Sequence, residues 1–272
     1  MKIGVFDSGY GGLTILEKIR ERLPQYDYLY LGDNARAPYG TRSFEVIYEY
    51  TLQAVRWLES QGCRLIILAC NTASAKALRT IQQHDINPDK LRVLGVVRPT
   101  VEAVPALTQT GHVGILATPA TVSSESYLLE LAKLKNPQLI VTQQACPMWV
   151  PLIESGEHFS AGAEFFVNKY LCELFAKDAQ IDTLVLGCTH YPLLLDKIME
   201  WLNCRGTCVS VISQGLIVAD SLADYLSRHA DIEQALSQNG TCTYITTESA
   251  DKFRDSASMF LSKPVEVRHI EF

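Results

Sequence analysis

The stretch Leu65-Ile66-Ile67-Leu68-Ala69-Cys70-Asn71-Thr72 decides the fold class, because it joins an apolar run of strand length directly to a polar turn. A segment with helical periodicity follows from Ser74 to His84, and this alternation recurs along the chain. Alternating strands and amphipathic helices predict an α/β fold with mostly parallel sheets flanked by helices. The expected strands are Lys2–Phe6, Tyr28–Leu31, Leu65–Ala69, Arg92–Val96, His112–Leu116, Gln138–Val141, Thr183–Leu186, Cys208–Ile212 and Thr241–Ile245. The expected helices are Leu13–Leu23, Ser43–Ser60, Ser74–His84, Ala161–Ala176, Leu193–Leu202, Ile217–Arg228 and Glu248–Leu261.

Two pairs of strand ends resemble each other, which indicates an internal repeat. Gly4-Val5-Phe6-Asp7-Ser8 aligns with Gly114-Ile115-Leu116-Ala117-Thr118, and Ile67-Leu68-Ala69-Cys70 aligns with Val185-Leu186-Gly187-Cys188. The repeat predicts two similar lobes. In parallel sheets, ligands bind beyond the carboxyl ends of the strands, so we expect the active site in the cleft between the lobes.

The first lobe is expected to be discontinuous in sequence. Pro99 and Pro105 interrupt the chain after the fourth expected strand and indicate a boundary there. We expect residues 1–97 plus 208–272 to form the first lobe and residues 98–207 to form the second.

Composition excludes several classes of protein. The chain has 272 residues, 47% of them hydrophobic, and a formal net charge of -6 without a Lys/Arg-rich run, which disfavours binding to nucleic acid. The first residues include charges and glycines too early for a signal peptide, and the apolar runs have only strand length. We therefore expect a cytoplasmic protein that binds neither nucleic acid nor membrane.

The eight cysteines indicate reduced thiols rather than a disulfide framework, because the chain is too long for a small stapled domain. Cys204 and Cys208 lack a second ligand pair with metal-site spacing, so no metal site is expected. No two cysteines have the C-x-x-C spacing of thiol redox proteins. Most of these cysteines are expected to be structural: Cys63, Cys146, Cys172, Cys204, Cys208 and Cys242.

Cys70 and Cys188 differ from the others, because each directly follows an apolar strand and precedes polar groups and an expected helix. Amides at a helix N-terminus stabilise a thiolate or a bound carboxylate. Two thiols in matched lobes suit racemisation, in which one group removes a proton from one face of a carbon while the other donates to the opposite face. This chemistry needs no cofactor.

Two further residues stand beside these thiols. Asp7 lies in the turn Asp7-Ser8-Gly9-Tyr10-Gly11-Gly12, which is read either as an ordinary capped turn or as an anion cradle with a carboxylate near Cys70. The turn lacks the lysine of a phosphate loop. His190 is either a structural histidine or a partner that polarises Cys188.

The motifs resemble those of the glutamate racemase family within the aspartate/glutamate racemases. They are Asp7-Ser8-Gly9, Leu31-Gly32-Asp33 with Pro38-Tyr39-Gly40, Cys70-Asn71-Thr72-Ala73, Cys146-Pro147 with Val150-Pro151-Leu152-Ile153-Glu154, and Gly187-Cys188-Thr189-His190-Tyr191-Pro192. The resemblance implies interconversion of L- and D-glutamate without pyridoxal phosphate or metal. It also implies D-glutamate supply for peptidoglycan, a bacterial cytoplasmic location and a homodimer.

The resemblance also implies a role for individual residues. Cys70 is expected to deprotonate D-glutamate and Cys188 to deprotonate L-glutamate, assisted by Asp7 and His190, with Asp33 and Glu154 as auxiliaries. The residues expected to bind substrate are Asp7, Ser8, Tyr39, Gly40, Asn71, Thr72, Thr118, Thr121, Thr189 and His190.

The sequence departs from the family pattern at a few positions outside the thiol motifs. Arg98 and Thr100 flank Pro99 where the family often has an acid and a small residue, and Asn34 replaces a usual threonine. Ile212-Ser213-Gln214-Gly215 stands where an Asp-Ser pair is more typical. These differences leave the lobe contacts, subunit contacts and regulation open.

Three rival functions are weighed against a glutamate racemase. A two-thiol racemase for aspartate or another amino acid shares every thiol motif, because substrate length is selected by the shape of the pocket. A non-catalytic amino-acid-binding protein is disfavoured by the presence of both cysteines. A thiol redox protein is disfavoured by their separation in sequence.

Overall fold

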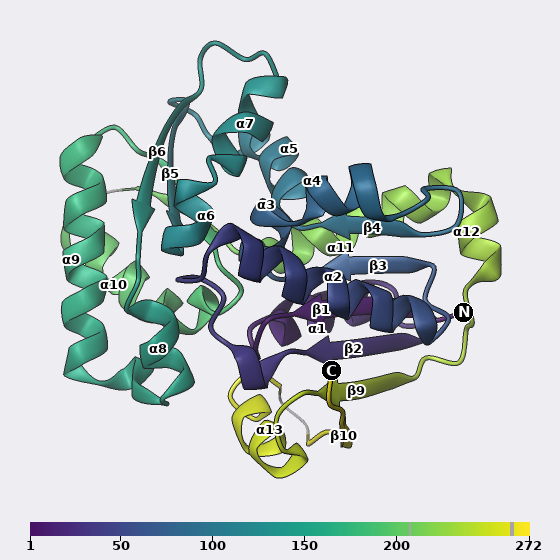
Figure 1. Cartoon of the computed structure of the whole chain (residues 1–272). Coiled ribbons are helices and arrows are strands. Elements are labelled where there is room, and N and C mark those ends of the chain that lie inside the picture. Colours follow the sequence, from purple (N-terminus) through teal and green to yellow (C-terminus); the bar gives the residue numbers. More distant parts are fainter. Residues whose placement is uncertain (207, 262–263) are drawn as a thin grey trace.

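The computed structural model describes residues 1–206, 208–261 and 264–272 and contains two parallel β-sheets (Figure 1). The six-stranded sheet has the order β10-β9-β2-β1-β3-β4, and the four-stranded sheet has the order β6-β5-β7-β8. Every strand pair is parallel. The strands are β1 Ile3–Asp7, β2 Tyr28–Gly32, β3 Leu65–Leu68, β4 Arg92–Gly95, β5 His112–Ala117, β6 Ile140–Ala145, β7 Thr183–Gly187, β8 Ser210–Ile212, β9 Cys242–Thr246 and β10 Val267–His269. The predicted α/β fold with two parallel sheets is confirmed.

Helices cover both sheets (Figure 1). They are α1 Gly12–Arg22, α2 Phe44–Ser60, α3 Asn71–Lys76, α4 Leu78–Thr80, α5 Val97–Leu107, α6 Pro119–Ser123, α7 Ser126–Lys133, α8 Trp149–Glu154, α9 Ala161–Lys177, α10 Leu195–Cys204, α11 Gln214–Arg228, α12 Ala230–Ala235 and α13 Ala250–Ala257. No helix among the described residues has both the length and the apolar character that a membrane span requires.

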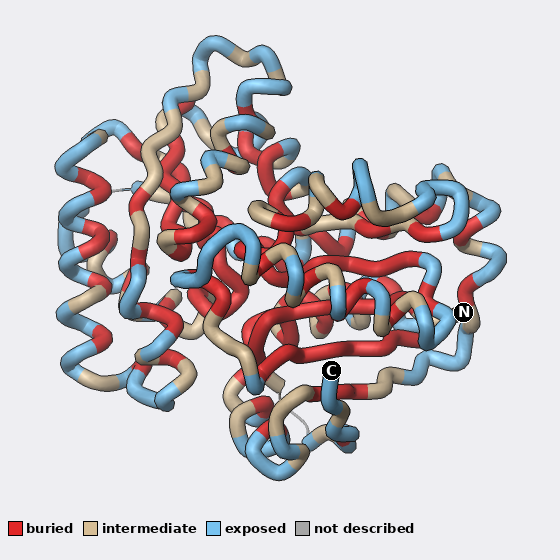
Figure 2. The backbone as a smooth tube through the Cα atoms, in the orientation of Figure 1, coloured by how far each residue is buried: buried red, intermediate tan, exposed pale blue. Residues whose placement is uncertain are grey.

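The central strands are buried along their whole length, as the tube in Figure 2 shows. β1, β2, β3 and β7 contain only buried residues. Parallel strands that are covered on both faces are continuous apolar runs in the sequence, and this pattern explains why these strands could be predicted. A single apolar cluster extends from Ile3 and Val5 in the first sheet to Leu184 and Leu186 in the second, so the two sheets share packing.

Two connections join the sheets. α5 links β4 of the six-stranded sheet to β5 of the four-stranded sheet, and α11 follows β8 and packs on α1. Residue 207, at which the second lobe was expected to end, lies outside the described residues. The strand expected at Cys208–Ile212 forms as Ser210–Ile212 and pairs with β7, so the four-stranded sheet extends beyond that boundary.

Several local features differ from the sequence expectations. The segment after Gly95 forms α5, although its prolines indicated a boundary. Pro99 lies in the first turn of this helix, where a missing N–H costs nothing. The helix expected over Ser74–His84 is divided into α3, α4 and a π-helical turn at Ile81–Asp85. β10 was not predicted, because Val267–His269 is too short to show a pattern.

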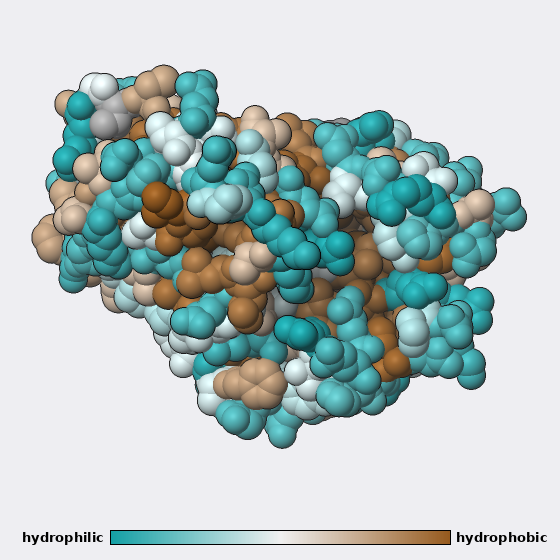
Figure 3. Space-filling model, turned by 90° about the horizontal axis from the view of Figure 1, so that it is seen from above, coloured by the Kyte–Doolittle hydropathy of each residue, from teal (hydrophilic) through white to brown (hydrophobic). Residues whose placement is uncertain are grey.

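Figure 3 shows the molecule from above, where apolar surface gathers near the middle of the face. A cavity of about 780 Å³ lies among α3, α4, α5, α7 and α11. Its lining includes the apolar residues Leu78, Leu94 and Leu129 and the charged residues Lys76 and Arg79. Neither Cys70 nor Cys188 lines this cavity.

Candidate active site

The turn after β1 places Asp7 and Ser8 against the second lobe. The Gly9 amide donates to Asp7 Oδ2 at 2.9 Å, and Thr189 Oγ1 donates to Asp7 Oδ1 at 3.4 Å. A Cβ at Gly11 would lie 2.4 Å from Thr189 Oγ1 and 2.5 Å from His190 Nδ1, closer than side-chain atoms pack. Glycine is therefore required here by close approach of the lobes.

Cys70 follows β3 and caps the N-terminus of α3. The Ala73 amide donates to Cys70 Sγ at 3.4 Å, and Ser8 Oγ lies 3.2 Å from the same sulfur. Burial and then the nearby Asp7 carboxylate raise the pKa of the Cys70 thiol to about 12, while the bonds from Ser8 and Ala73 oppose the rise. A negative charge on Cys188 also raises the pKa of Cys70, as expected for two thiols in one site.

Cys188 follows β7 and has a different set of partners. Its Sγ lies 3.9 Å from His190 Nδ1, and His190 Nε2 lies 3.0 Å from Glu154 Oε1 of α8. Burial disfavours the imidazolium form of His190, but the hydrogen bonds to Cys188 and Glu154 outweigh burial and raise the pKa of His190 well above its usual value. A positively charged His190 stabilises negative charge on the Cys188 sulfur.

Asp7 lies between the two sets of partners and is fully buried. Burial raises the pKa of its carboxyl group, whereas the charge of His190 and the amides of Gly9 and Gly12 oppose that rise. A carboxylate with a raised pKa is a better proton acceptor, so Asp7 is suited to take a proton from a neighbouring thiol.

Three threonine hydroxyls, one from α3 and two from the start of α6, contact each other between the two lobes. Thr72 Oγ1 lies 3.0 Å from Thr118 Oγ1 and 3.3 Å from Thr121 Oγ1, and Thr118 donates to Thr121 at 3.0 Å. The Ala120 amide donates to Gly40 O at 2.9 Å. These contacts place the Tyr39-Gly40 loop and α6 beside the turn that follows Cys70.

Asp33 is buried and already has several hydrogen-bond donors. It accepts from Arg36 Nε at 2.7 and 2.9 Å, from Thr247 Oγ1 at 2.8 Å and from the Tyr39 hydroxyl. These four bonds occupy both oxygens of the Asp33 carboxylate. Its contacts join Arg36 and the Tyr39 loop to Thr247, the residue after β9.

The structure brings the predicted site residues together in small groups. Side-chain hydrogen bonds join Ser8 to Cys70, Thr189 to Asp7, His190 to both Cys188 and Glu154, and Thr72 to Thr118 and Thr121. Charge interactions relate Asp7 to Cys70 and His190, and Cys70 to Cys188. Thr14 was missed, although its hydroxyl donates to Thr189 O at 3.2 Å across the lobes. Gln214 and Tyr127 were missed as well, because both reach Asn71 from distant parts of the chain. In the described ranges, no group of three or more His, Cys, Asp or Glu is arranged to hold a metal ion.

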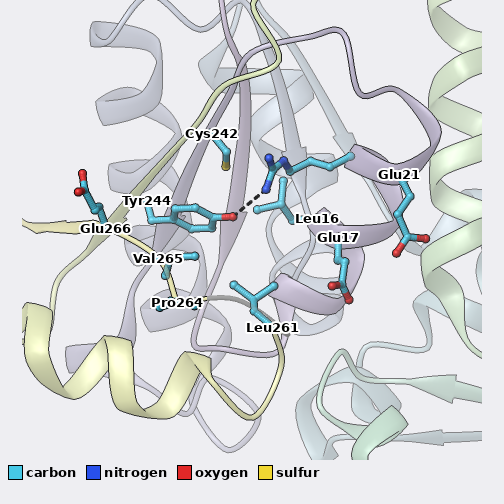
Figure 4. Close-up of a pocket in the computed structure, with 10 residues that line it drawn as sticks. Leu16, Glu17, Glu21, Cys242, Tyr244, Leu261, Pro264, Val265 and Glu266 are labelled. Carbon is cyan, nitrogen blue, oxygen red and sulfur yellow. Dashed lines mark hydrogen bonds between the residues drawn. The ribbon is translucent and has the colours of Figure 1, made fainter.

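A second cavity, of about 550 Å³, lies away from the thiols between α1, β9 and the segment after α13 (Figure 4). Arg20 donates to the Tyr244 hydroxyl at 3.1 Å there, and Cys242 also lines this cavity. The thiols of Cys70 and Cys188, by contrast, are only 5% and 6% exposed. Residues of both lobes therefore bury the two thiols in this structure.

Comparison with known proteins agrees with this geometry. A family model described as Asp/Glu/Hydantoin racemase matches residues 3–220. The glutamate racemase of Ruegeria sp. strain TM1040 is 42% identical over 275 aligned residues, which cover 97% of this chain and 98% of that protein. The glutamate racemase of Geobacter metallireducens is 38% identical and covers 95% and 92% of the two chains.

Solved structures are similar over the same length. The crystal structure of a glutamate racemase isoform from Bacillus anthracis has a TM-score of 0.89 at 34% identity, with 99% of this chain and 97% of that chain covered. The glutamate racemase of Francisella tularensis in complex with D-glutamate has a TM-score of 0.87 at 34% identity, with the same coverage. The chain therefore belongs to the Asp/Glu/hydantoin racemase family.

Proposed function

We propose that this chain is a glutamate racemase in which Cys70 and Cys188 act as two opposed proton-transfer groups. The observation that carries the proposal is that each thiol stands at the end of a central strand of its own sheet with its own acid–base partners. Asp7 and Ser8 serve Cys70, whereas His190 and Glu154 serve Cys188. The relatives named glutamate racemase support glutamate as the substrate.

The electrostatics favour one resting protonation state. The raised pKa of Cys70 keeps its thiol protonated near neutral pH, so Cys70 is the proton donor of this state and Cys188, beside His190, is the proton acceptor. In this state Cys188 removes the α-proton of L-glutamate, and Cys70 donates its thiol proton to the opposite face of the same carbon. The C–H bond breaks on one face and forms on the other, so D-glutamate leaves with Cys188 protonated and Cys70 as the thiolate.

The reverse reaction starts from that second state. The Cys70 thiolate removes the α-proton of D-glutamate while the Cys188 thiol donates. Asp7 assists Cys70 by holding a proton close to it while the free enzyme converts from one protonation state to the other. Asp7 is suited to this because burial raises the pKa of its carboxyl group. His190 performs the same function for Cys188.

Small polar groups around the thiols suit a substrate with one amino and two carboxylate groups. The proposed substrate-binding residues are Asp7, Ser8, Tyr39, Gly40, Asn71, Thr72, Thr118, Thr121, Thr189 and His190. Hydroxyl and amide donors bind carboxylates in a dry site without a cluster of arginines. We propose that Asp33 contributes to substrate binding only by accepting a hydrogen bond from the Tyr39 hydroxyl.

The deciding experiment incubates the protein with single amino acids in deuterium oxide without added cofactor. L-Glutamate is expected to yield D-glutamate carrying deuterium at the α-carbon, as followed by mass spectrometry and chiral chromatography. Exchange of aspartate without exchange of glutamate would assign the chain to a different substrate. Binding of glutamate with no exchange in either enantiomer would assign it to the non-catalytic class.

Three coarser features belong to the same proposal. We expect a cytoplasmic enzyme that supplies D-glutamate for peptidoglycan, and a homodimer, which light scattering coupled to gel filtration measures directly. We also propose that the chain forms two lobes and passes between them twice, at α5 and after β8. The second crossing is placed after β8 because Ser210–Ile212 belongs to the four-stranded sheet. On this division the first lobe comprises residues 1–97 and 213–272.

A further inference from the structure

Four buried polar side chains form a network at the junction of the two lobes. We call Asn71, Thr100, Tyr127 and Gln214 the Gln214 network; each is at most 2% exposed. Buried polar groups of this kind are stable only when their hydrogen bonds are satisfied, and a satisfied network holds its members in one arrangement.

The bonds in the network have a defined direction. Asn71 Nδ2 donates to Gln214 Oε1 at 2.6 Å, Gln214 Nε2 donates to the Tyr127 hydroxyl at 2.9 Å, and that hydroxyl donates to Asn71 Oδ1 at 2.7 Å. Gln214 Nε2 also donates to Thr100 Oγ1 at 2.8 Å, and Thr100 donates in turn to Val96 O at 2.7 Å. Because the ring is closed, the orientations of both amides are determined by their partners.

This arrangement constrains Asn71, the residue that follows Cys70. Its Oδ1 is occupied by Tyr127, and one N–H of Nδ2 is occupied by Gln214. One N–H of the Asn71 amide is left to donate to a ligand. Rotation of the amide breaks two bonds, so the remaining N–H points in one direction only.

The network also joins four segments that meet only in the folded protein. Asn71 begins α3 of the first lobe, and Tyr127 lies in α7 of the second. Thr100 lies in α5 and Gln214 begins α11, which are the two connections between the sheets. The orientation of the Asn71 amide therefore depends on both connections.

The side chains of Thr100 and Gln214 are bonded to each other at 2.8 Å. Both lie in stretches at which the sequence is expected to depart from the racemase pattern. A glutamine has two N–H groups to satisfy, and the threonine hydroxyl supplies the acceptor for the second one. Thr100 and Gln214 therefore satisfy each other's hydrogen bonds in the buried network.

We propose that Gln214 is a positioning residue that orients the Asn71 amide toward the substrate, with Thr100 as its anchor. The inference rests on the proposed function, since it assigns Asn71 to substrate binding. A bond made equally to substrate and transition state affects KM more than kcat. The predicted signature of losing Gln214 is a raised KM for both enantiomers with kcat nearly retained.

The test compares Gln214→Ala, Thr100→Val and the double variant, each assayed with L- and D-glutamate. Gln214→Ala is expected to raise KM about tenfold, the effect of one or two hydrogen bonds, with kcat within about threefold. Thr100→Val is expected to raise KM by a smaller factor, and the double variant is expected to match Gln214→Ala, since Thr100 acts through Gln214. Thr100→Ser keeps the hydroxyl and is expected to restore the KM of the original chain.

Thr51→Val is the matched control, because the buried Thr51 hydroxyl donates to Ile47 O at 2.7 Å in the same way that Thr100 donates to Val96 O. It should leave KM unchanged and lower the melting temperature less than Thr100→Val does, because Thr100→Val also leaves an N–H of Gln214 without its acceptor. An unchanged KM in Gln214→Ala, or effects of the two changes that multiply, would overturn the inference. If the unmodified chain racemises no glutamate, the proposed function fails instead, and that result is seen before any variant is made.

Discussion

The hydroxyl of Thr189 donates to Oδ1 of Asp7 at 3.4 Å. The residue that follows Cys188 therefore binds the carboxylate that raises the pKa of Cys70. Thr189 follows Cys188 in the second lobe, and Asp7 ends β1 of the first lobe. The protonation states of the two sides are also coupled by charge, because negative charge on Cys188 raises the pKa of Cys70 and the charge of His190 opposes the rise in the pKa of Asp7. Proton transfer across the substrate requires such coupling, because each thiol must be protonated when the other is not.

Removing either thiol is the most direct prediction. Cys70→Ala and Cys188→Ala are each expected to lower racemisation of glutamate by about a thousandfold or more, since each deletes one of two general acid–base groups. Chiral chromatography of the product measures the loss. Cys172→Ala is the control, because Cys172 is an exposed cysteine. Full activity in either of the first two variants contradicts a two-thiol mechanism.

The two thiols are expected to differ in their reactivity toward iodoacetamide. Near pH 7.5 Cys188 should be alkylated at least about tenfold faster than Cys70, because the thiolate is the reactive form and burial beside Asp7 raises the pKa of Cys70 to about 12. Peptide mass spectrometry at successive times gives both rates. Glutamate should protect both sites while the exposed Cys172, Cys204 and Cys208 react as before. Faster alkylation of Cys70 would reverse the proposed resting state.

Replacing Glu154 tests the electrostatic role of His190. The pKa of His190 is raised, so the imidazole is positively charged at pH values below this pKa. It loses that charge as the pH rises through the pKa. Glu154→Gln removes a charge that favours the imidazolium, so the pKa falls. The alkaline decrease in kcat/KM for L-glutamate is therefore expected at lower pH in the variant, by about one pH unit, in a full pH–rate profile.

Glu157→Gln is the control for that profile, because Glu157 is exposed and lies close in sequence to Glu154. Its alkaline limb should coincide with that of the unmodified chain. If the alkaline decrease in kcat/KM of Glu154→Gln occurs at the same pH as in the unmodified chain, or at a higher pH, His190 does not act as a cation beside Cys188.

The strands and the thiol positions were predictable because they are local features. β1, β3 and β7 are continuous apolar runs, and the residue after such a strand must lie at the edge of the sheet. α5 was missed because Pro99 and Pro105 are usual at boundaries, whereas the structure places Pro99 in a first helical turn. A single sequence gives no means to choose between these two uses of proline.

The rest of the site depends on pairs that lie far apart in the chain. Gln214 and Asn71 are separated by 143 residues, and Thr189 and Asp7 by 182, so no local pattern relates them. Asp33 differs from these pairs because it lies in a recognised motif and was predicted as a site residue. Its carboxylate oxygens are nevertheless occupied by Arg36, Tyr39 and Thr247. Which polar residues bind each other is decided by tertiary packing, and the sequence identifies only their positions at strand ends.

Gly11→Ala tests whether close approach of the lobes is needed for activity. The added Cβ would lie 2.4 Å from Thr189 Oγ1 and 2.5 Å from His190 Nδ1, so either the lobes separate or these two side chains move. The backbone at Gly11 has φ -59 and ψ -32, which alanine adopts without strain, so the effect arises from contact alone. A displacement of about 1 Å between acid–base groups is expected to reduce kcat/KM about a hundredfold or more.

Gly162→Ala is the matched control for that experiment, because Gly162 lies in α9 and the nearest atom to its added Cβ is Ser160 Oγ at 3.4 Å. Alanine favours the helix, so this variant should keep full activity and a melting temperature equal to or above that of the unmodified chain. Gly11→Ala should still show a cooperative thermal transition, because the added atom lies at the surface between the lobes and not inside either sheet. Retention of full activity in Gly11→Ala would mean that the contact of Gly11 with Thr189 and His190 is dispensable, and that proton transfer does not depend on the closed arrangement of the lobes.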